Sequence, residues 1–340
     1  MQTTEPRTSR RASRTRHTSK QDTPPAPTVA RRKPCNLLLV CKRRFHEHDD
    51  FTEIARLIRK IAPDVRPRLI SDRFRNALKP YYWLRPTLAV SNEGLRRYRP
   101  LRGKMFHGRQ MPKSQEYTAL EKLDIPVPRW AIFSDGQAPD LSEFDKYVVR
   151  KPDMGACGAE VKIKRKGRIR KGRIYTEYEG ESDVMVQEFI YTGRWPVCYR
   201  VSTFFGHVLS AWRVEADQSR RPLAGPDAFA GSPDAGGVSI ASSGRGCTYT
   251  LTDEPEILEL ARKAHEAFPD IPLLGTDIIR EVPSGKLYVL EVNSCGRTWH
   301  YSSKRGLSIQ ECGNFDIKEQ FGALRIATNV LIEKAREHAE

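Results

Sequence analysis

Two carboxylates and an amide in the C-terminal quarter of the chain have the types and spacing of metal ligands. Asp277 and Glu291 lie in two apolar runs of β type that are separated by a Pro-Ser-Gly turn. A turn centred on Ser284 would place Asp277 opposite Glu291, and the alternation of side chains along strands would place Asn293 on the same face. Facing carboxylates repel each other. A hard cation would remove that repulsion, and Mg²⁺ holding a substrate's phosphates fits best. The alternative is a solvated hairpin face that happens to contain acids.

A strand that ends in a lysine precedes a loop of small residues, a combination suited to phosphate. The apolar run 146–152 contains Lys151, and the loop after it contains Gly155 and Gly158. Glycines allow backbone N–H groups to approach a phosphate closely, and the lysine supplies the compensating charge. Two glycines after a strand also mark ordinary turns, so this loop alone is a weak signal.

Two further segments contain residues that a phosphate site could use. The first is an apolar strand that closes on an acid and contains Gln187, Glu188, Phe189 and Ile190. The second is typical of a hairpin that turns at Gly206-His207, which would bring Arg200 and Arg213 roughly opposite each other. A surface ion-pair ladder across a hairpin is the alternative for the two arginines.

In this order the segments resemble the ATP-grasp superfamily, particularly its carboxylate–amine ligases such as the glutathione synthetase and ribosomal-protein glutamate ligase groups. The resemblance covers about residues 100–335 and includes Lys113, which precedes a helix and the motif Ile125-Pro126-Val127-Pro128. No single segment is specific, but the colinear set is. The resemblance implies an α/β (α+β) ATP-grasp fold of two subdomains with the nucleotide between them.

The resemblance implies that four regions bind the nucleotide and its metal. Lys113 and Lys151 would contact the α- and β-phosphates of ATP. Residues 187–190 would form a hinge whose backbone reads the adenine. The metal ligands would be Asp277, Glu291 and Asn293, with one or two Mg²⁺ ions bridging the phosphates and Mn²⁺ as the alternative ion.

The implied reaction fits these residue types. A carboxylate is a poor electrophile, so ATP would first convert it into an acyl phosphate, which an amine then attacks. Arg200 and Arg213 would face the γ-phosphate and the acyl-phosphate oxygens. Positioning and charge neutralisation dominate such chemistry, and the sequence shows no serine triad, nucleophilic cysteine motif or Walker loop.

Composition limits the remaining classes of protein. A chain of 340 residues with 39% hydrophobic residues is long enough for two or three structural units around a real core. No apolar run approaches the length of a membrane-spanning helix. Seven cysteines without a Cys-x-x-Cys pair predict reduced thiols and a cytoplasmic location.

The chain is basic, with a formal net charge of +16. Residues 1–34 are rich in arginine, serine, threonine and proline and are predicted to be a disordered tail. A second basic segment, residues 162–173, has glycines where a hairpin would turn. It could attract an acidic peptide or another polyanion, but we favour a solvated flap. Nucleic acid is not favoured because zinc-finger spacing and RNA-binding aromatic motifs are absent.

Residues 35–105 are predicted to form a small α/β domain of parallel strands that precedes an ATP-grasp domain at 106–335. Asp49 or Asp50 would cap a helix that runs to about Ile61. Further helices are predicted at 255–267 and from about 316 to 340, and the Gly/Ser/Pro-rich loop 225–246 would close over the nucleotide.

The sequence therefore predicts an ATP- and Mg²⁺-dependent ligase that joins a carboxylate to an amine. Its substrate would be a small molecule or an acidic peptide. Whether the chain forms a homo-oligomer stays open. A catalytically silent nucleotide-binding module and a polyanion-binding protein are the alternatives.

Overall fold

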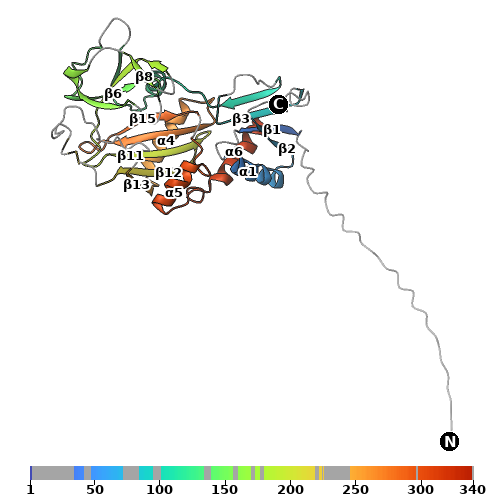
Figure 1. Cartoon of the computed structure of the whole chain (residues 1–340). Coiled ribbons are helices and arrows are strands. Elements are labelled where there is room, and N and C mark those ends of the chain that lie inside the picture. Colours follow the sequence, from blue (N-terminus) through green and yellow to red (C-terminus); the bar gives the residue numbers. More distant parts are fainter. Residues whose placement is uncertain are drawn as a thin grey trace. The chain divides into compact units, whose positions relative to one another are not determined.

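The computed structural model describes most of the chain between Pro34 and His338 (Figure 1). The described residues are Met1, 34–41, 47–71, 84–94, 101–133, 139–155, 160–169, 173–176, 180–218, 222–223, 225, 246–295 and 298–338. The predicted tail, Gly158 and most of the loop 225–246 lie outside them. The chain divides into two units, Met1–Arg32 and Lys33–Glu340, and the description below concerns the second. The predicted domain boundaries stay predictions.

A parallel sheet forms the N-terminal part of this unit, as the sequence predicts. Its strands are β1 (Cys35–Cys41), β2 (Val65–Ser71), β3 (Thr87–Ser91) and β4 (Gly103–His107), in the order β2-β1-β3-β4. Every residue of β1 is buried, which is typical of a parallel strand that is covered on both faces.

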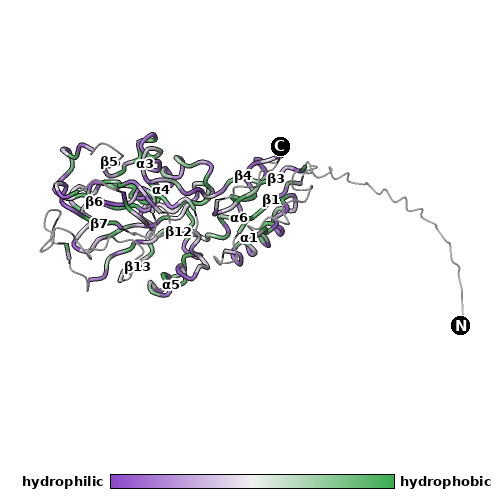
Figure 2. Tube along the Cα trace, turned by 45° about the horizontal axis from the view of Figure 1, so that its top comes forward, coloured by the Kyte–Doolittle hydropathy of each residue, from purple (hydrophilic) through white to green (hydrophobic). Residues whose placement is uncertain are grey.

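Helix α1 (Glu47–Ile61) connects β1 to β2 and packs against α6 (Ala323–Glu337). Along its tube, hydrophobic and hydrophilic stretches alternate (Figure 2), as expected for a helix with one buried face. The predicted end at Ile61 is confirmed, but the predicted cap is wrong, because α1 begins at Glu47 and includes Asp49 and Asp50. Helix α6 begins later than predicted because Gly322, at its N-terminus, has a φ of 71°, outside the helical region.

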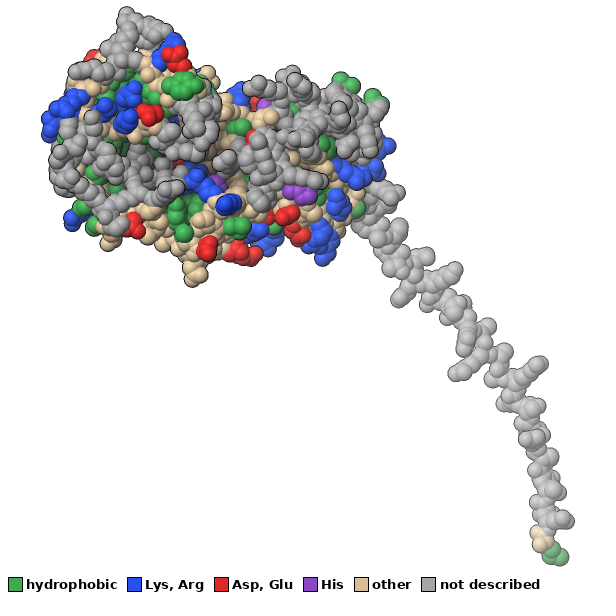
Figure 3. Space-filling model, viewed as in Figure 1, with side chains coloured by type: hydrophobic (Ala, Val, Ile, Leu, Met, Phe, Trp, Pro, Cys, Tyr) green, Lys and Arg blue, Asp and Glu red, His purple; other side chains and the backbone are tan. Residues whose placement is uncertain are grey.

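The second sheet is antiparallel and contains the predicted phosphate strand. Its order is β5 (Trp130–Phe133), β10 (Val184–Glu188), β6 (Tyr147–Pro152) and β7 (Lys162–Arg165). The predicted hairpin within 162–173 is wrong, because β7 pairs with β6, and β8 (Ile174–Thr176) pairs with β9 (Gly180–Ser182). A short 3₁₀ helix, η2 (Lys166–Arg168), follows β7. Lys and Arg side chains gather on the surface over β6 and β8 (Figure 3).

The third sheet is the scaffold of the predicted metal ligands. Its order is β13 (Cys247–Leu251), β12 (His207–Ala216), β11 (Val197–Phe204), β14 (Leu273–Arg280) and β15 (Leu287–Asn293), with every pair antiparallel. Helix α4 (Pro255–Glu266), close to its predicted bounds, packs on one face of this sheet through Ile257, Ala261 and Ala264. Helix α3 (Lys113–Glu121) contacts the edge strand β15, and α5 (Lys304–Gly313) contacts β13.

No helix in the described part of the chain is both long and apolar enough to cross a membrane. The six cysteines among the described residues form no disulfide bonds with one another.

A buried aspartate joins α1 to the segment that follows β15. The Oδ2 atom of Asp50 accepts hydrogen bonds from the indole N–H of Trp299, at 2.8 Å, and from the hydroxyl of Ser302. Its other carboxylate oxygen lies 2.9 Å from the ammonium of Lys318. Because the carboxylate is only 2% exposed, these partners replace the water that it loses on folding.

We expect Asp50→Ala to lower the free energy of unfolding by about 3 kcal/mol, because it removes the carboxylate that the buried indole N–H of Trp299, the hydroxyl of Ser302 and the ammonium of Lys318 share. Urea denaturation measures this difference. The control is Asp49→Ala, since the neighbouring side chain is 90% exposed and should contribute less than about 0.5 kcal/mol. Equal effects of the two substitutions would contradict this account.

Candidate active site

The predicted pairing of Asp277 with Glu291 is confirmed by the register of β14 and β15. Arg200 on β11 is in turn the register partner of Asp277. Register partners share a face of a sheet, so the three side chains form a row across adjacent strands. The row places one guanidinium beside two carboxylates.

Arg200 and Asp277 form a two-point ion pair that is almost wholly buried. Nη2 of Arg200 lies 2.7 Å from Oδ2 of Asp277, and Nε bonds Oδ1. The two side chains are 16% and 8% exposed. Burial raises the pKa of Asp277, and the guanidinium opposes that shift. The geometry fixes both groups, since a planar guanidinium matches a carboxylate at two points.

A glycine leaves the room that Thr298 needs beside this ion pair. An added Cβ at Gly275 would lie 2.9 Å from Cγ2 of Thr298 and 3.7 Å from Cδ of Arg200. The first distance is shorter than ordinary van der Waals contact, so a side chain here would displace its neighbours. Gly275 also accepts a hydrogen bond from the side-chain amide of Asn293, at 3.3 Å, which fixes the third predicted ligand beside the row.

Lys113 neutralises the second carboxylate. Its ammonium lies 3.6 Å from Oε1 of Glu291 and donates to the carbonyl of Gly155 at 2.8 Å. Asp153 joins the same helix end to this loop, because its carboxylate accepts from the N–H and the hydroxyl of Ser114, both at 2.8 Å. A carboxylate at a helix N-terminus is favourable for the helix dipole. The start of α3 and the glycine loop are therefore bound together.

Lys151 and Gln187 lie on adjacent strands and contact one tyrosine, which the sequence analysis did not identify. The hydroxyl of Tyr117 accepts from Nζ of Lys151 at 3.4 Å and lies 3.1 Å from Oε1 of Gln187. It also lies 2.6 Å from the carbonyl of Leu290. Lys151 is 5% exposed, and burial lowers the pKa of its ammonium to about 8.

Glu116 is a second buried residue that the sequence analysis left without a role. It accepts a backbone hydrogen bond from Val292, while Oε2 has no hydrogen-bond partner among the described residues. Burial, and next the charge of Glu291, raise its pKa well above the ordinary value. Glu116 could have been found from the sequence by its position three residues after Lys113, because residues at i and i+3 share a face of a helix.

The predicted hinge, residues 187–190, consists of the last two residues of β10 and the two residues after it. The N–H of Glu188 donates to the carbonyl of Arg129 at 2.7 Å, and its carboxylate accepts from the N–H of Arg129 at 3.2 Å. Phe189 packs against the hydrophobic cluster that contains Val149, and Ile190 is buried. The backbone N–H of Glu188 is therefore already hydrogen-bonded to another residue of the protein.

Arg213 lies apart from Arg200, and the prediction that the two arginines face each other is wrong by one residue. Arg213 is the register partner of Tyr199, whereas Arg200 is paired with Trp212. Successive strand residues point to opposite faces, so Arg213 is on the face that α4 covers, where Tyr199 packs. Its guanidinium bonds Glu215 at 2.6 Å.

The predicted metal ligands supply only oxygen. Asp277 and Glu291 offer carboxylates and Asn293 an amide, and each carboxylate is balanced here by a cationic side chain. Mg²⁺ commonly binds one or two protein carboxylates and completes its shell with phosphate and water oxygens, so this donor set fits it. Within the described residues, no three His, Cys, Asp or Glu side chains gather as a self-sufficient metal site.

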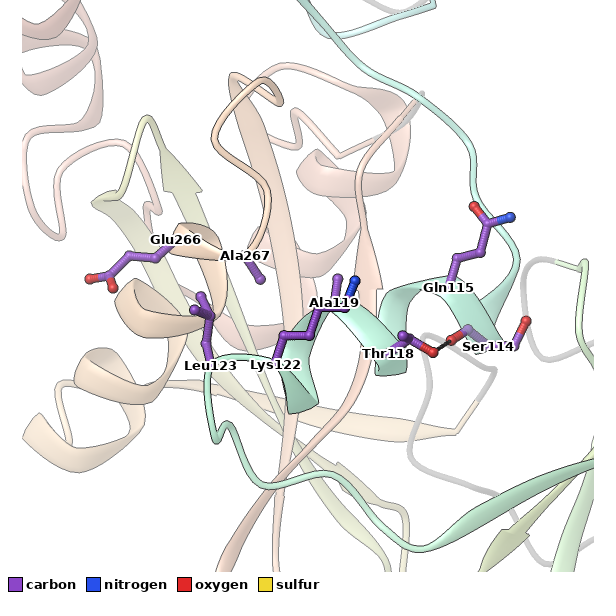
Figure 4. A pocket seen from close by; sticks show the side chains of 8 residues that line it. All are labelled: Ser114, Gln115, Thr118, Ala119, Lys122, Leu123, Glu266 and Ala267. Atoms are coloured by element: carbon purple, nitrogen blue, oxygen red, sulfur yellow. Dashed lines mark hydrogen bonds between the residues drawn. The ribbon is translucent and has the colours of Figure 1, made fainter.

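An open cavity of about 550 Å³ lies on the outer side of α3, and the predicted site residues do not line it (Figure 4). Its walls are the exposed face of α3, including Gln115 and Lys122, and the end of α4 at Glu266. The opposite face of α3, with Lys113 and Tyr117, is buried. The helix therefore separates this cavity from the charged row.

The profile of the ATP-grasp domain family matches residues 111–298, more than half of the chain. The chain belongs to this family, and the sequence-based assignment of fold is confirmed. A comparison with curated protein sequences finds no match.

Similar solved structures include three ligases. PsnB, an ATP-grasp ligase complexed with precursor peptide PsnA2 and AMPPNP, is 14% identical, with a TM-score of 0.51, and the alignment covers 88% of this chain and 98% of PsnB. The D-cycloserine synthetase DcsG is 13% identical, with a TM-score of 0.48 and coverages of 90% and 100%. The D-alanine–D-alanine ligase of Bacillus anthracis is 14% identical, with a TM-score of 0.45 and coverages of 90% and 99%. The similarity to PsnB shows a shared fold.

We expect the burial of Lys151 to change how stability depends on pH. Between about pH 8 and 10.5 the unfolded chain binds more protons at this residue than the folded chain, so the free energy of unfolding rises with pH. Lys151→Met lacks this contribution. Relative to the variant, the wild type should gain about 3 kcal/mol between pH 7 and pH 10.5, measured by urea denaturation. If the free energies of unfolding of the wild type and Lys151→Met changed in parallel with pH, the lowered pKa of Lys151 would be contradicted.

Proposed function

We propose that this chain is an ATP-dependent ligase that activates a carboxylate as an acyl phosphate and joins it to an amine. The observation that supports this best is the row of Arg200, Asp277 and Glu291, with Lys113 at its end. Its two neighbouring carboxylates can bind a hard cation, while the guanidinium and the ammonium that flank them can bind a polyphosphate. Such a site fits phosphoryl transfer, where charge neutralisation and positioning supply most of the catalysis.

The nucleotide would bind between the second and third sheets. Lys113 and Lys151 would neutralise the phosphates, with the loop of Gly155 and Gly158 close to them. Because the N–H of Glu188 is already bonded to Arg129, the adenine would be read by the carbonyl of Glu188 and by the backbone of Phe189 and Ile190. This assignment removes the N–H of Glu188 from the predicted hinge contacts.

Asp277, Glu291 and Asn293 would bind Mg²⁺. When bound, the ion would neutralise phosphate charge as it develops during transfer. Asp277 engages the Nε and Nη2 side of Arg200, which leaves the Nη1 side to contact the transferred phosphoryl group. Arg200 would then stabilise the acyl phosphate and the oxyanion formed when the amine attacks.

The fold shared with PsnB supports a nucleotide, since that ligase was solved with AMPPNP and a precursor peptide. Both an acidic peptide and a small carboxylic acid stay candidates for the substrate, and the basic surface over β6 and β8 favours an acidic one. A screen of acids, amines and acidic peptides for ADP release identifies the pair.

We expect Glu291→Ala and Lys151→Ala each to abolish ADP formation, because one removes a metal ligand and the other a phosphate contact. The matched control is Glu281→Ala, an acid at the turn of the same hairpin whose carboxylate accepts a hydrogen bond from the hydroxyl of Ser284. It should keep full turnover. Full turnover in either site variant would refute the assignment, and nucleotide binding by the wild type without ADP release would favour the silent module.

We expect the two arginines to differ. Arg200→Met should lower kcat at least about 100-fold, the usual loss of an oxyanion donor. Arg213→Met should stay close to wild type, because Arg213 lies on the opposite face and bonds Glu215. Steady-state ADP release measures both. A larger loss in Arg213→Met would place the phosphoryl group on the other face of the sheet.

A further inference from the structure

Tyr117 is fully buried and lies where three proposed nucleotide contacts meet. Its hydroxyl is 3.4 Å from Nζ of Lys151, 3.1 Å from Oε1 of Gln187 and 2.6 Å from the carbonyl of Leu290. Lys151 and Gln187 belong to the second sheet and Leu290 to the third. A single oxygen on α3 thus bonds both sheets between which the nucleotide would lie.

The carbonyl of Leu290 belongs to a β-bulge beside the charged row of Arg200, Asp277 and Glu291. Ile278 pairs with Val289 and Asp277 pairs with Glu291, so Leu290 is an extra residue without a partner on β14. A bulge interrupts the ladder of hydrogen bonds and turns the next side chain. Tyr117 supplies a donor for this carbonyl, and the peptide group that it bonds leads directly into Glu291.

The same oxygen orients Lys151. A tyrosine hydroxyl has one proton to donate and lone pairs to accept with, so it can donate to Leu290 while it accepts from the ammonium of Lys151. That ammonium also lies 5.1 Å from the centre of the Tyr117 ring. Ring and hydroxyl together limit the positions of a long, flexible side chain in a site where water is largely excluded.

The geometry points to Tyr117 as a positioning residue that fixes Lys151 and the bulge before Glu291 relative to each other, so that the phosphates and the metal are bound as one unit. This inference rests on the proposed function, because it assigns the phosphates to Lys151 and the metal to Glu291. Tyr117 touches neither ligand itself and acts through these two residues.

Tyr117→Phe tests the inference because it removes one oxygen and keeps the ring and its packing. The probes are Mg·AMPPNP, which reaches Lys151 and Glu291, and adenosine, which lacks phosphates. We expect the variant to bind Mg·AMPPNP about tenfold more weakly, the loss of roughly one hydrogen bond to a charged group. Its affinity for adenosine should change less than about twofold. Calorimetry and competition titrations measure the two affinities, and circular dichroism melting checks the fold.

The matched control is Tyr301→Phe. Tyr301 is equally buried, and its hydroxyl bonds Ser210 at 3.1 Å, outside the contacts of Tyr117. This variant should bind Mg·AMPPNP like the wild type. Unchanged Mg·AMPPNP affinity in Tyr117→Phe, or equal losses for Mg·AMPPNP and adenosine, would overturn the inference while leaving the proposed function intact. A wild-type chain that does not bind Mg·AMPPNP would overturn both.

Discussion

The site depends on the neutralisation of two carboxylates that face each other on adjacent strands. Buried like charges cost free energy unless opposite charges compensate them. Arg200 bonds Asp277 and Lys113 lies beside Glu291, so each acid has a cation supplied by another element. The remaining features serve this arrangement: Gly275 makes room for Thr298 beside the ion pair, and Asp153 binds the start of the helix that contains Lys113.

The pairing of Asp277 with Glu291 could be predicted from the sequence, although the local geometry that produces it could not. Near the turn, Arg280 pairs with Leu287, and a regular ladder from there would place Asp277 opposite Leu290. The bulge at Leu290 shifts the register by one and restores the predicted pair. The carbonyl of Leu290 makes a tertiary contact with Tyr117, which no local sequence pattern encodes.

The position of the turn explains the error for the arginines. The hairpin turns at Phe205-Gly206, both with positive φ, rather than at Gly206-His207. That turn alone would place Arg213 opposite Cys198, and the register shift between Ser202 and Thr203 moves Arg213 to Tyr199, one residue from the expected partner. A shift of one residue exchanges the faces of a strand, so a small error in the turn becomes a large error in the site.

The parallel N-terminal sheet and the lysine strand follow from apolar patterns, which is why they could be predicted. Glu116 and Tyr117 could not, because polar residues on a helix are normally solvated, and only tertiary packing shows that they lie on the buried face of α3. Polar residues that are buried at a site depart from the usual pattern of polar residues on the surface, and a functional role can explain that departure.

The central claim is that the charged row binds a divalent cation together with a nucleoside triphosphate. Isothermal titration calorimetry of the full chain with ATP, in buffer with Mg²⁺ and in buffer with EDTA, tests it most directly. The account predicts binding that requires Mg²⁺. No heat of binding in either buffer, or equal affinity in both, would contradict it.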